Sequence, residues 1–185
     1  MRVIAGDLKG RKLIAPKGTN TRPTAGRVKE AVFSMVQSLL EDAVCFDLFA
    51  GSGALGIEAL SRGAARVYFC EIDPATLESL TQNLNACGID ERASVLKADW
   101  RVAIQNIREK CDIVFIDAPY NKCEYYSDIL NRLGYCACLK KGATVVVERD
   151  AGTAGYRLPD GFERVREKHY GNIGVDILIY SGEEE

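Results

Sequence analysis

A glycine-rich segment, residues 44–56, constrains the fold of this chain more than any other feature. An apolar run stops at Gly51, and Gly53 and Gly56 complete the spacing G-x-G-x-x-G before a helical pattern begins. In a strand–turn–helix context this spacing is typical of nucleotide-binding sites. The first glycine permits the tight turn, the second lets a ligand approach the backbone, and the third lets the helix pack against the strand. A glycine turn can also end a strand for structural reasons alone, but the context favours cofactor binding.

Strand-like and helix-like segments alternate from residue 44 onward. The expected strands cover 44–49, 66–71, 93–97, 113–116 and 143–147, and the expected helices cover 54–62, 74–87, 101–110 and 126–133. Repeated β-α units require a parallel sheet with helices on both faces. Residues 162–170 and 175–180 have only a short turn between them, which predicts a terminal antiparallel hairpin. The sequence therefore predicts an α/β, Rossmann-like fold with a mostly parallel seven-stranded sheet.

An acidic residue, Asp47, stands four positions before Gly51. A carboxylate at the end of a strand does not suit a phosphate group, but it suits a ligand that carries ammonium and sulfonium charges. The arrangement resembles the first motif of class I S-adenosylmethionine-dependent methyltransferases. This resemblance implies S-adenosylmethionine as the cofactor and S-adenosylhomocysteine as its product. Methyltransferases of this class normally finish with an antiparallel hairpin, whereas dehydrogenase-type Rossmann domains continue with another β-α unit.

Two further acidic residues lie where expected strands end. Glu71 stands twenty positions after Gly51, where a carboxylate can accept hydrogen bonds from both ribose hydroxyls of a bound adenosine; the alternative is an acid that faces solvent. Asp99 either binds the adenine amino group or caps the helix over 101–110, and both interpretations stay open. Trp100 is expected to pack rather than to stack on a ligand. The predicted cofactor-binding residues are Asp47, Phe49, Ala50, Gly51, Ser52, Gly53, Glu71, Ile72, Asp99 and Trp100.

The second chemistry-bearing stretch is Asp117, Ala118, Pro119 and Tyr120, at the carboxyl end of the expected strand 113–116. It resembles the Asp/Asn-Pro-Pro-Tyr/Phe motif of methyltransferases that modify exocyclic amino groups, with Ala118 in place of the usual proline. The Asp117 carboxylate and the Ala118 carbonyl can accept the two N–H bonds of such an amine and orient its lone pair. Tyr120 can stack on a flipped-out base. Taken alone, the same residues also suit a turn at the end of a strand.

The N-terminal residues differ in charge from the rest of the chain. Of 24 Lys and Arg residues, eight lie within residues 1–30, which hold only two of the 26 Asp and Glu residues. Segments 2–5 and 11–14 predict a β-hairpin, and a helical pattern follows up to residue 40. A basic extension on an acidic body suggests contact with RNA or DNA, although a solvated hairpin would show the same charges. The predicted RNA-binding residues are Arg2, Lys9, Arg11, Lys12, Arg22 and Arg27.

Taken together, these motifs resemble the bacterial 16S rRNA guanine-N2 methyltransferase family (RsmD type) from end to end. The matching stretches are residues 2–6, 10–11, 21–24, 27–30, 47–56, 58–64 and 117–120. The N-terminal stretches discriminate best, because general amino-methyltransferases lack them. The resemblance implies methyl transfer to N2 of one guanine, position 966 in the family's name, within 16S rRNA of a partly or fully assembled small ribosomal subunit. It also divides the chain into an RNA-contacting extension, 1–42, and a cofactor-binding domain, 43–185.

Three other functions fit parts of the sequence. An adenine-N6 or other nucleic-acid amino-methyltransferase would carry the same motif at 117–120, but the N-terminal stretches argue against it. A non-catalytic ribosome-assembly factor could have the same fold, but the glycine turn, Asp117 and Tyr120 are intact. An NAD-dependent dehydrogenase is disfavoured by the terminal hairpin and by the short chain of 185 residues.

Cysteine and histidine usage argues against a metal site. Seven cysteines are spread along the chain without a C-x-x-C pair, and His169 is the only histidine. No apolar run is long enough to span a membrane, and the N-terminus lacks the pattern of a signal peptide. The sequence thus predicts a cytoplasmic protein, a monomer, without metal and without membrane contact.

Overall fold

The computed structural model describes residues 1–16, 23–119, 125–152 and 155–182. Its strands are β1 (Val44–Asp47), β2 (Arg66–Glu71), β3 (Ala93–Lys97), β4 (Cys111–Asp117), β5 (Leu139–Asp150), β6 (Phe162–Tyr170) and β7 (Ile173–Tyr180). Its helices are α1 (Pro23–Val36), η1 (Gln37–Leu39), α2 (Ala54–Ser61), α3 (Pro74–Cys87), η2 (Asp90–Arg92), α4 (Trp100–Gln105) and α5 (Tyr125–Tyr135).

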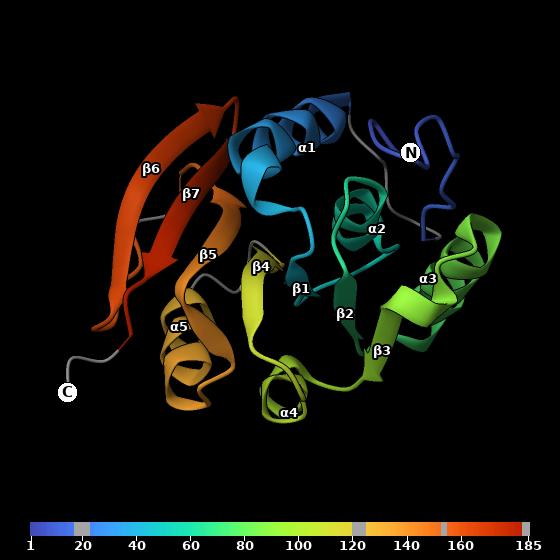
Figure 1. The fold of residues 1–185 in the computed structure, drawn as a ribbon. Coiled ribbons are helices and arrows are strands. Elements are labelled where there is room, and N and C mark those ends of the chain that lie inside the picture. Colours follow the sequence, from blue (N-terminus) through green and yellow to red (C-terminus); the bar gives the residue numbers. More distant parts are fainter. Residues whose placement is uncertain (17–22, 120–124, 153–154, 183–185) are drawn as a thin grey trace.

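These strands form one sheet in the order β3-β2-β1-β4-β5-β7-β6 (Figure 1). Strands β1 to β5 pair in parallel, whereas β7 is antiparallel to both β5 and β6. The predicted seven-stranded, mostly parallel sheet with a terminal antiparallel hairpin is confirmed. The order reverses between β1 and β4, and open α/β sheets bind ligands beyond the carboxyl ends of the strands at such a switch point.

Helices cover both faces of the sheet and bury it. On one face α1, α2 and α3 pack through Phe33, Ile57 and Leu80, and on the other face α4 and α5 pack through Ile104 and Ile129 (Figure 1). All four residues of β1 are buried, as expected for a central parallel strand with helices on both sides. The rigid sheet therefore fixes where the residues after β1, β2 and β4 can lie.

Several predicted elements differ in extent from the structure. The strand expected over 44–49 ends at Asp47, because the tight glycine turn begins there. The helix expected over 101–110 covers only Trp100–Gln105, because β4 already begins at Cys111 and the chain must turn back to the sheet first. β5 begins at Leu139 rather than at residue 143, with a register shift against β4 between Cys111 and Ile113.

The N-terminal arm, residues 1–16, forms less sheet than the predicted hairpin. Its antiparallel pairing amounts to one isolated bridge, Arg2 to Lys12, with backbone bonds from Val3 to Arg11 and from Leu13 to Met1 nearby. The arm lies against α2 and α3 (Figure 1). Val3 and Leu13 are buried and belong to the same core cluster as Ile57 of α2. The proposed division at residue 42 remains a prediction.

Polar side chains of α2 hold the arm in place. Glu58 is fully buried, and its carboxylate accepts hydrogen bonds from the Ile4 and Ala5 N–H groups at 2.8 and 3.0 Å. The same carboxylate pairs with Lys29 at 2.9 Å and with Arg62 at 2.8 Å. Ion pairs and backbone donors together satisfy the buried charge of Glu58, so the arm and α1 are fastened to the helix that follows the glycine turn.

Candidate active site

A cavity of about 370 Å³ lies beyond the carboxyl ends of β1, β2 and β4. It is lined by Leu48, Phe49, Cys70, Glu71, Ile72, Ala98, Asp99, Trp100, Asp117, Pro119 and Tyr125. The structure thus brings together residues from both predicted motifs, which stand far apart in the sequence. The predicted cofactor-binding residues outside this lining, whose role in cofactor binding remains a prediction, are Asp47, Ala50, Gly51, Ser52 and Gly53.

Asp47 ends β1 beneath the glycine turn and is almost completely buried, with 1% of its surface exposed. Its Oδ2 accepts a hydrogen bond from the Gly56 N–H at 2.9 Å, whereas Oδ1 has no partner among the described residues. Burial raises the pKa of Asp47 to about 7, and the charge of Glu71 adds to the rise while the Gly56 bond opposes it. A buried carboxylate oxygen without a donor favours a cationic or hydrogen-bonding ligand nearby.

The glycine turn is held by Glu71. One carboxylate oxygen accepts from the Gly51 N–H at 3.0 Å, and the other accepts from the Ile72 and Asp73 N–H groups at 2.8 Å. Gly51 has a φ of +54°, which confirms the tight turn that its position predicted. These bonds fix the Glu71 carboxylate at the cavity wall and leave one of its acceptor sites for a hydroxyl donor.

Gly56 lies where α2 packs closely against β2. A Cβ atom placed on Gly56 would lie 2.2 Å from the Phe69 ring on β2. No side chain fits there, so the predicted role of this glycine in helix–strand packing is confirmed. At Gly53, by contrast, a Cβ would meet the Leu80 side chain at 2.6 Å, and the predicted approach of a ligand to its backbone remains a prediction.

The residues around Asp99 form one wall of the cavity. Asp99 accepts a hydrogen bond from the Arg101 N–H at 2.9 Å and caps α4, which confirms the capping interpretation, while its adenine-binding role remains a prediction. Trp100 is buried and packs against Tyr125, with ring centroids 5.8 Å apart, as its expected packing role requires. Ile72 lines the cavity and exposes 63% of its surface. This exposed apolar side chain offers a surface on which a flat ring can pack.

Asp117 ends β4 on the other side of the cavity, opposite Glu148 in the β4–β5 register. Its side chain is open to the cavity, and Pro119 beside it also lines the wall. Loss of hydration beside the surrounding protein raises the pKa of the Asp117 carboxyl group above its ordinary range. The negative charges of Glu148 and Asp47 raise this pKa further. Ala118 is buried. Tyr120 lies outside the described residues, so its stacking role stays a prediction.

The predicted RNA-binding residues lie on the surface where the structure describes them. Arg2, Lys9, Arg11 and Lys12 of the arm and Arg27 of α1 are exposed; Arg22 lies outside the described residues. Lys29, which also counts among the basic residues of the extension, is buried against Glu58 and donates to the Arg2 carbonyl at 2.9 Å. Lys29 therefore holds the extension together and is not exposed to a ligand.

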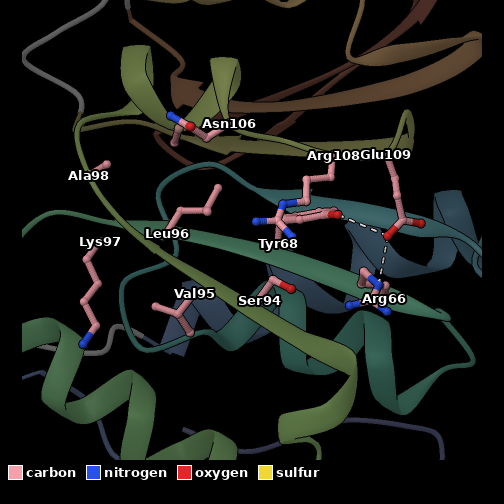
Figure 2. Close-up of a pocket in the computed structure, with 11 residues that line it drawn as sticks. Arg66, Tyr68, Ser94, Val95, Leu96, Lys97, Ala98, Asn106, Arg108 and Glu109 are labelled. Atoms are coloured by element: carbon pink, nitrogen blue, oxygen red, sulfur yellow. Dashed lines mark hydrogen bonds and ion pairs between the residues drawn. The ribbon is translucent and has the colours of Figure 1, made fainter.

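A larger groove, of about 870 Å³, lies along the β3 edge of the sheet. Figure 2 shows it between β3 and the segment after α4, where Glu109 accepts from the Tyr68 hydroxyl and pairs with Arg66, both at 3.1 Å. None of the predicted site residues lines this groove. The smaller cavity, which joins both motifs at the switch point of the sheet, is the candidate active site.

Comparison with known proteins shows the family of the chain. The family model "Conserved hypothetical protein 95" matches residues 1–179. Ribosomal RNA small subunit methyltransferase D of Escherichia coli (strain K12) is 34% identical over 177 residues, covering 96% of this chain and 88% of that protein. The chain belongs to the ribosomal RNA small subunit methyltransferase D family. The member from Haemophilus influenzae is also 34% identical, over 183 residues, covering 96% of this chain and 92% of that protein.

Solved structures from the same two organisms confirm the fold of this family member. The Escherichia coli protein yhhF, described as a methyltransferase, superimposes with a TM-score of 0.88 at 30% identity, covering 99% of each chain. The Haemophilus influenzae protein HI0767, described as a methylase, superimposes with a TM-score of 0.81 at 29% identity, covering 97% of each chain. The Rossmann-like methyltransferase fold predicted from the sequence is therefore confirmed.

Several residues that line or adjoin the candidate active site were not identified from the sequence. Leu48 and Cys70 directly precede residues that were selected, and their position at strand ends could have indicated them. Tyr125 reaches the cavity from the start of α5, and no spacing in the sequence relates it to Glu71 or Asp99. Asn83, which contacts the glycine turn, reads in sequence as an ordinary polar helix residue.

Two kinds of feature are absent from the described part of the chain. Within residues 1–16, 23–119, 125–152 and 155–182, no group of three or more His, Cys, Asp or Glu side chains is placed to hold a metal ion. No helix in these ranges is long and apolar enough to cross a membrane.

Proposed function

We propose that this chain transfers a methyl group from S-adenosylmethionine to the exocyclic N2 amine of a guanine in 16S rRNA of the small ribosomal subunit. The observation that carries the proposal is the single cavity that Glu71 and Asp117 share, in a chain whose relatives are named ribosomal RNA small subunit methyltransferase D. The exposed basic side chains of the N-terminal arm supply the contact with the RNA backbone. An rRNA substrate is consistent with the predicted cytoplasmic location.

The residues at the cavity fit S-adenosylmethionine. Asp47, buried next to the lining residue Leu48, has an unpartnered carboxylate oxygen whose charge favours the ammonium and sulfonium groups, and Glu71 has one acceptor site left for a ribose hydroxyl. Ile72 and Trp100 offer apolar surface to the adenine ring, and Asp99 lies at the same wall as an acceptor for its amino group. When bound, the cofactor supplies an electrophilic methyl group on a sulfonium centre.

The residues after β4 hold the target base. A guanine N2 amine is a poor nucleophile, because its lone pair is delocalised into the ring. Acceptance of its two N–H bonds by the Asp117 carboxylate and the Ala118 carbonyl turns the lone pair toward the cofactor side of the cavity. Tyr120 stacks on the flipped-out base. No base needs to remove a proton before the transfer, since the nitrogen becomes acidic only as it is alkylated.

The test is methyl transfer from labelled S-adenosylmethionine to three substrates: small ribosomal subunits isolated without this protein, naked 16S rRNA, and duplex DNA. The proposal expects N2-methylguanine in the rRNA of the subunits. The Asp117→Ala variant should lose activity by about 100-fold or more, since one acceptor of a positioned amine is removed. Asp128→Asn, a change of an exposed carboxylate on α5, is the matched control and should leave activity unchanged.

Other outcomes contradict the proposal in different ways. Label on adenine N6, or in DNA alone, would support methyl transfer to an exocyclic amine but would refute a guanine of 16S rRNA as the substrate. Binding of cofactor without any transfer would favour a non-catalytic assembly factor. Wild-type turnover by Asp117→Ala would show that Asp117 does not hold the base.

A further inference from the structure

Asn83, a buried side chain, joins the N-terminal arm to the glycine turn. Asn83 lies on α3 and exposes 1% of its surface. Its Oδ1 accepts from the Ile14 N–H at 2.8 Å, and its Nδ2 donates to the Ile14 carbonyl at 2.9 Å. The same Nδ2 donates to the Ser52 carbonyl at 2.9 Å. The Asn83 amide therefore pairs with the Ile14 backbone as a neighbouring strand would. It also holds the Ser52 carbonyl, which belongs to the peptide that joins Ser52 to Gly53.

Ser61 and Glu58 of α2 bind other residues of the arm. Ser61, at the end of α2, accepts from the Leu8 N–H at 3.0 Å and donates to the Ala5 carbonyl. The Glu58 carboxylate accepts from the Ile4 and Ala5 N–H groups. These two residues anchor the first half of the arm, whereas Asn83 anchors its last described part and touches the turn as well.

The bond to Ser52 acts on the part of the turn that orients Glu71. The Ser52 carbonyl is one residue from Gly51, whose N–H donates to the Glu71 carboxylate. A change in the position of Ile14 moves the Asn83 amide, because both polar atoms of that amide are bonded to Ile14. The displacement then reaches the turn through one rigid side chain, since a buried amide has no water with which to exchange these bonds.

We propose that Asn83 is a positioning residue that couples RNA binding at the arm to cofactor binding at the glycine turn. The proposal rests on the proposed function, because it takes the arm as the RNA contact and the turn as part of the cofactor site. When RNA holds the arm, Asn83 holds Ser52 and the turn in the cofactor-binding geometry. By linkage, bound cofactor strengthens RNA binding by the same factor.

The experiment measures this factor directly. The dissociation constant for small ribosomal subunits, isolated from cells without this protein, is determined by filter binding with and without saturating S-adenosylhomocysteine. The wild type should bind subunits about fivefold or more tightly with the product present. Asn83→Ala should lower this ratio to about one. Asn83→Ser, which keeps one hydroxyl, is the second variant if the alanine protein does not fold.

Ser61→Ala is the matched control. It removes two hydrogen bonds to the arm, as Asn83→Ala does, but it leaves the Ser52 carbonyl bonded. It should weaken subunit binding in both conditions and keep the wild-type ratio, which a merely structural role for Asn83 would not predict. A ratio of one in the wild type, or equal ratios in the wild type and Asn83→Ala, overturns the coupling. Failure of the wild type to bind the product, seen by calorimetry without RNA, would instead reject the proposed function itself.

Discussion

Asp47 gives the sharpest prediction about the protein without its cofactor. In the folded chain its pKa is about 7, against an ordinary value of 3.8. A raised carboxyl pKa contributes stability that is present below the ordinary value and is lost as pH rises through the folded value. One group with this shift should lower the free energy of unfolding by about 2 to 3 kcal/mol between about pH 5 and pH 8. Asp47→Asn removes the ionisation and so should remove this loss.

The assay is urea unfolding of the cofactor-free protein at several pH values, for the wild type and for Asp47→Asn. Since Asp117 also has a raised pKa, both proteins lose stability with pH, and only their difference reports on Asp47. Asp128→Asn serves as the control for loss of an exposed carboxylate. A difference between wild type and Asp47→Asn that stays constant from about pH 5 to pH 8 would refute the reasoning.

The same carboxylate should make cofactor binding depend on pH. An ammonium group near Oδ1 stabilises the ionised form of Asp47, so binding below the folded pKa releases a proton. Affinity for S-adenosylhomocysteine should therefore fall about tenfold per pH unit below about pH 7 in the wild type, and the Asp47 part of this slope should be absent in Asp47→Asn. Titration calorimetry across this range measures both slopes.

Three further predictions concern other charged groups. Methyl transfer should rise with pH along a limb above the ordinary carboxyl range, because the ionised Asp117 carboxylate is a stronger acceptor of N–H bonds than the neutral acid and its pKa is raised. A pH–rate profile of the wild type beside Asp117→Asn, which cannot ionise and should lack this limb, measures this. Glu58→Gln should lower the free energy of unfolding by about 3 kcal/mol, because Lys29 loses its buried charged partner. Thermal and urea unfolding measure this change, and an unchanged unfolding midpoint would contradict it. Charge reversal at Arg11 should reduce the salt dependence of subunit binding, measured from about 50 to 200 mM salt.

The arrangement of the sheet follows from the sequence because it depends on local periodicity. Apolar runs at 66–71 and 113–116 read as buried strands, the helical stripes between them read as crossovers, and right-handed β-α-β connections leave few topologies. The cavity follows for the same reason: residues after parallel strands meet at one edge. The sequence alone therefore predicts that Glu71 and Asp117 share a site.

Buried polar contacts over long sequence distances could not be predicted in this way. Glu58 and Asn83 stand on helices where a charged or amide side chain normally faces water. Their burial depends on where the arm lies, and the arm is separated from them by 53 or more residues. Periodicity contains no information on such a pairing, so the sequence indicated the basic arm but not the residues that hold it.

The same contacts explain why the predicted N-terminal hairpin is so short. Backbone N–H groups of an arm need acceptors when they are buried, and a hairpin would supply them from its own second strand. Here Ile4, Ala5 and Ile14 instead donate to side chains of α2 and α3. Each bond that the arm makes to these helices is one that it does not make to itself. The arm therefore gains a fixed position against the helices that flank the glycine turn, and its short pairing is a consequence of that attachment rather than a sign of weak structure.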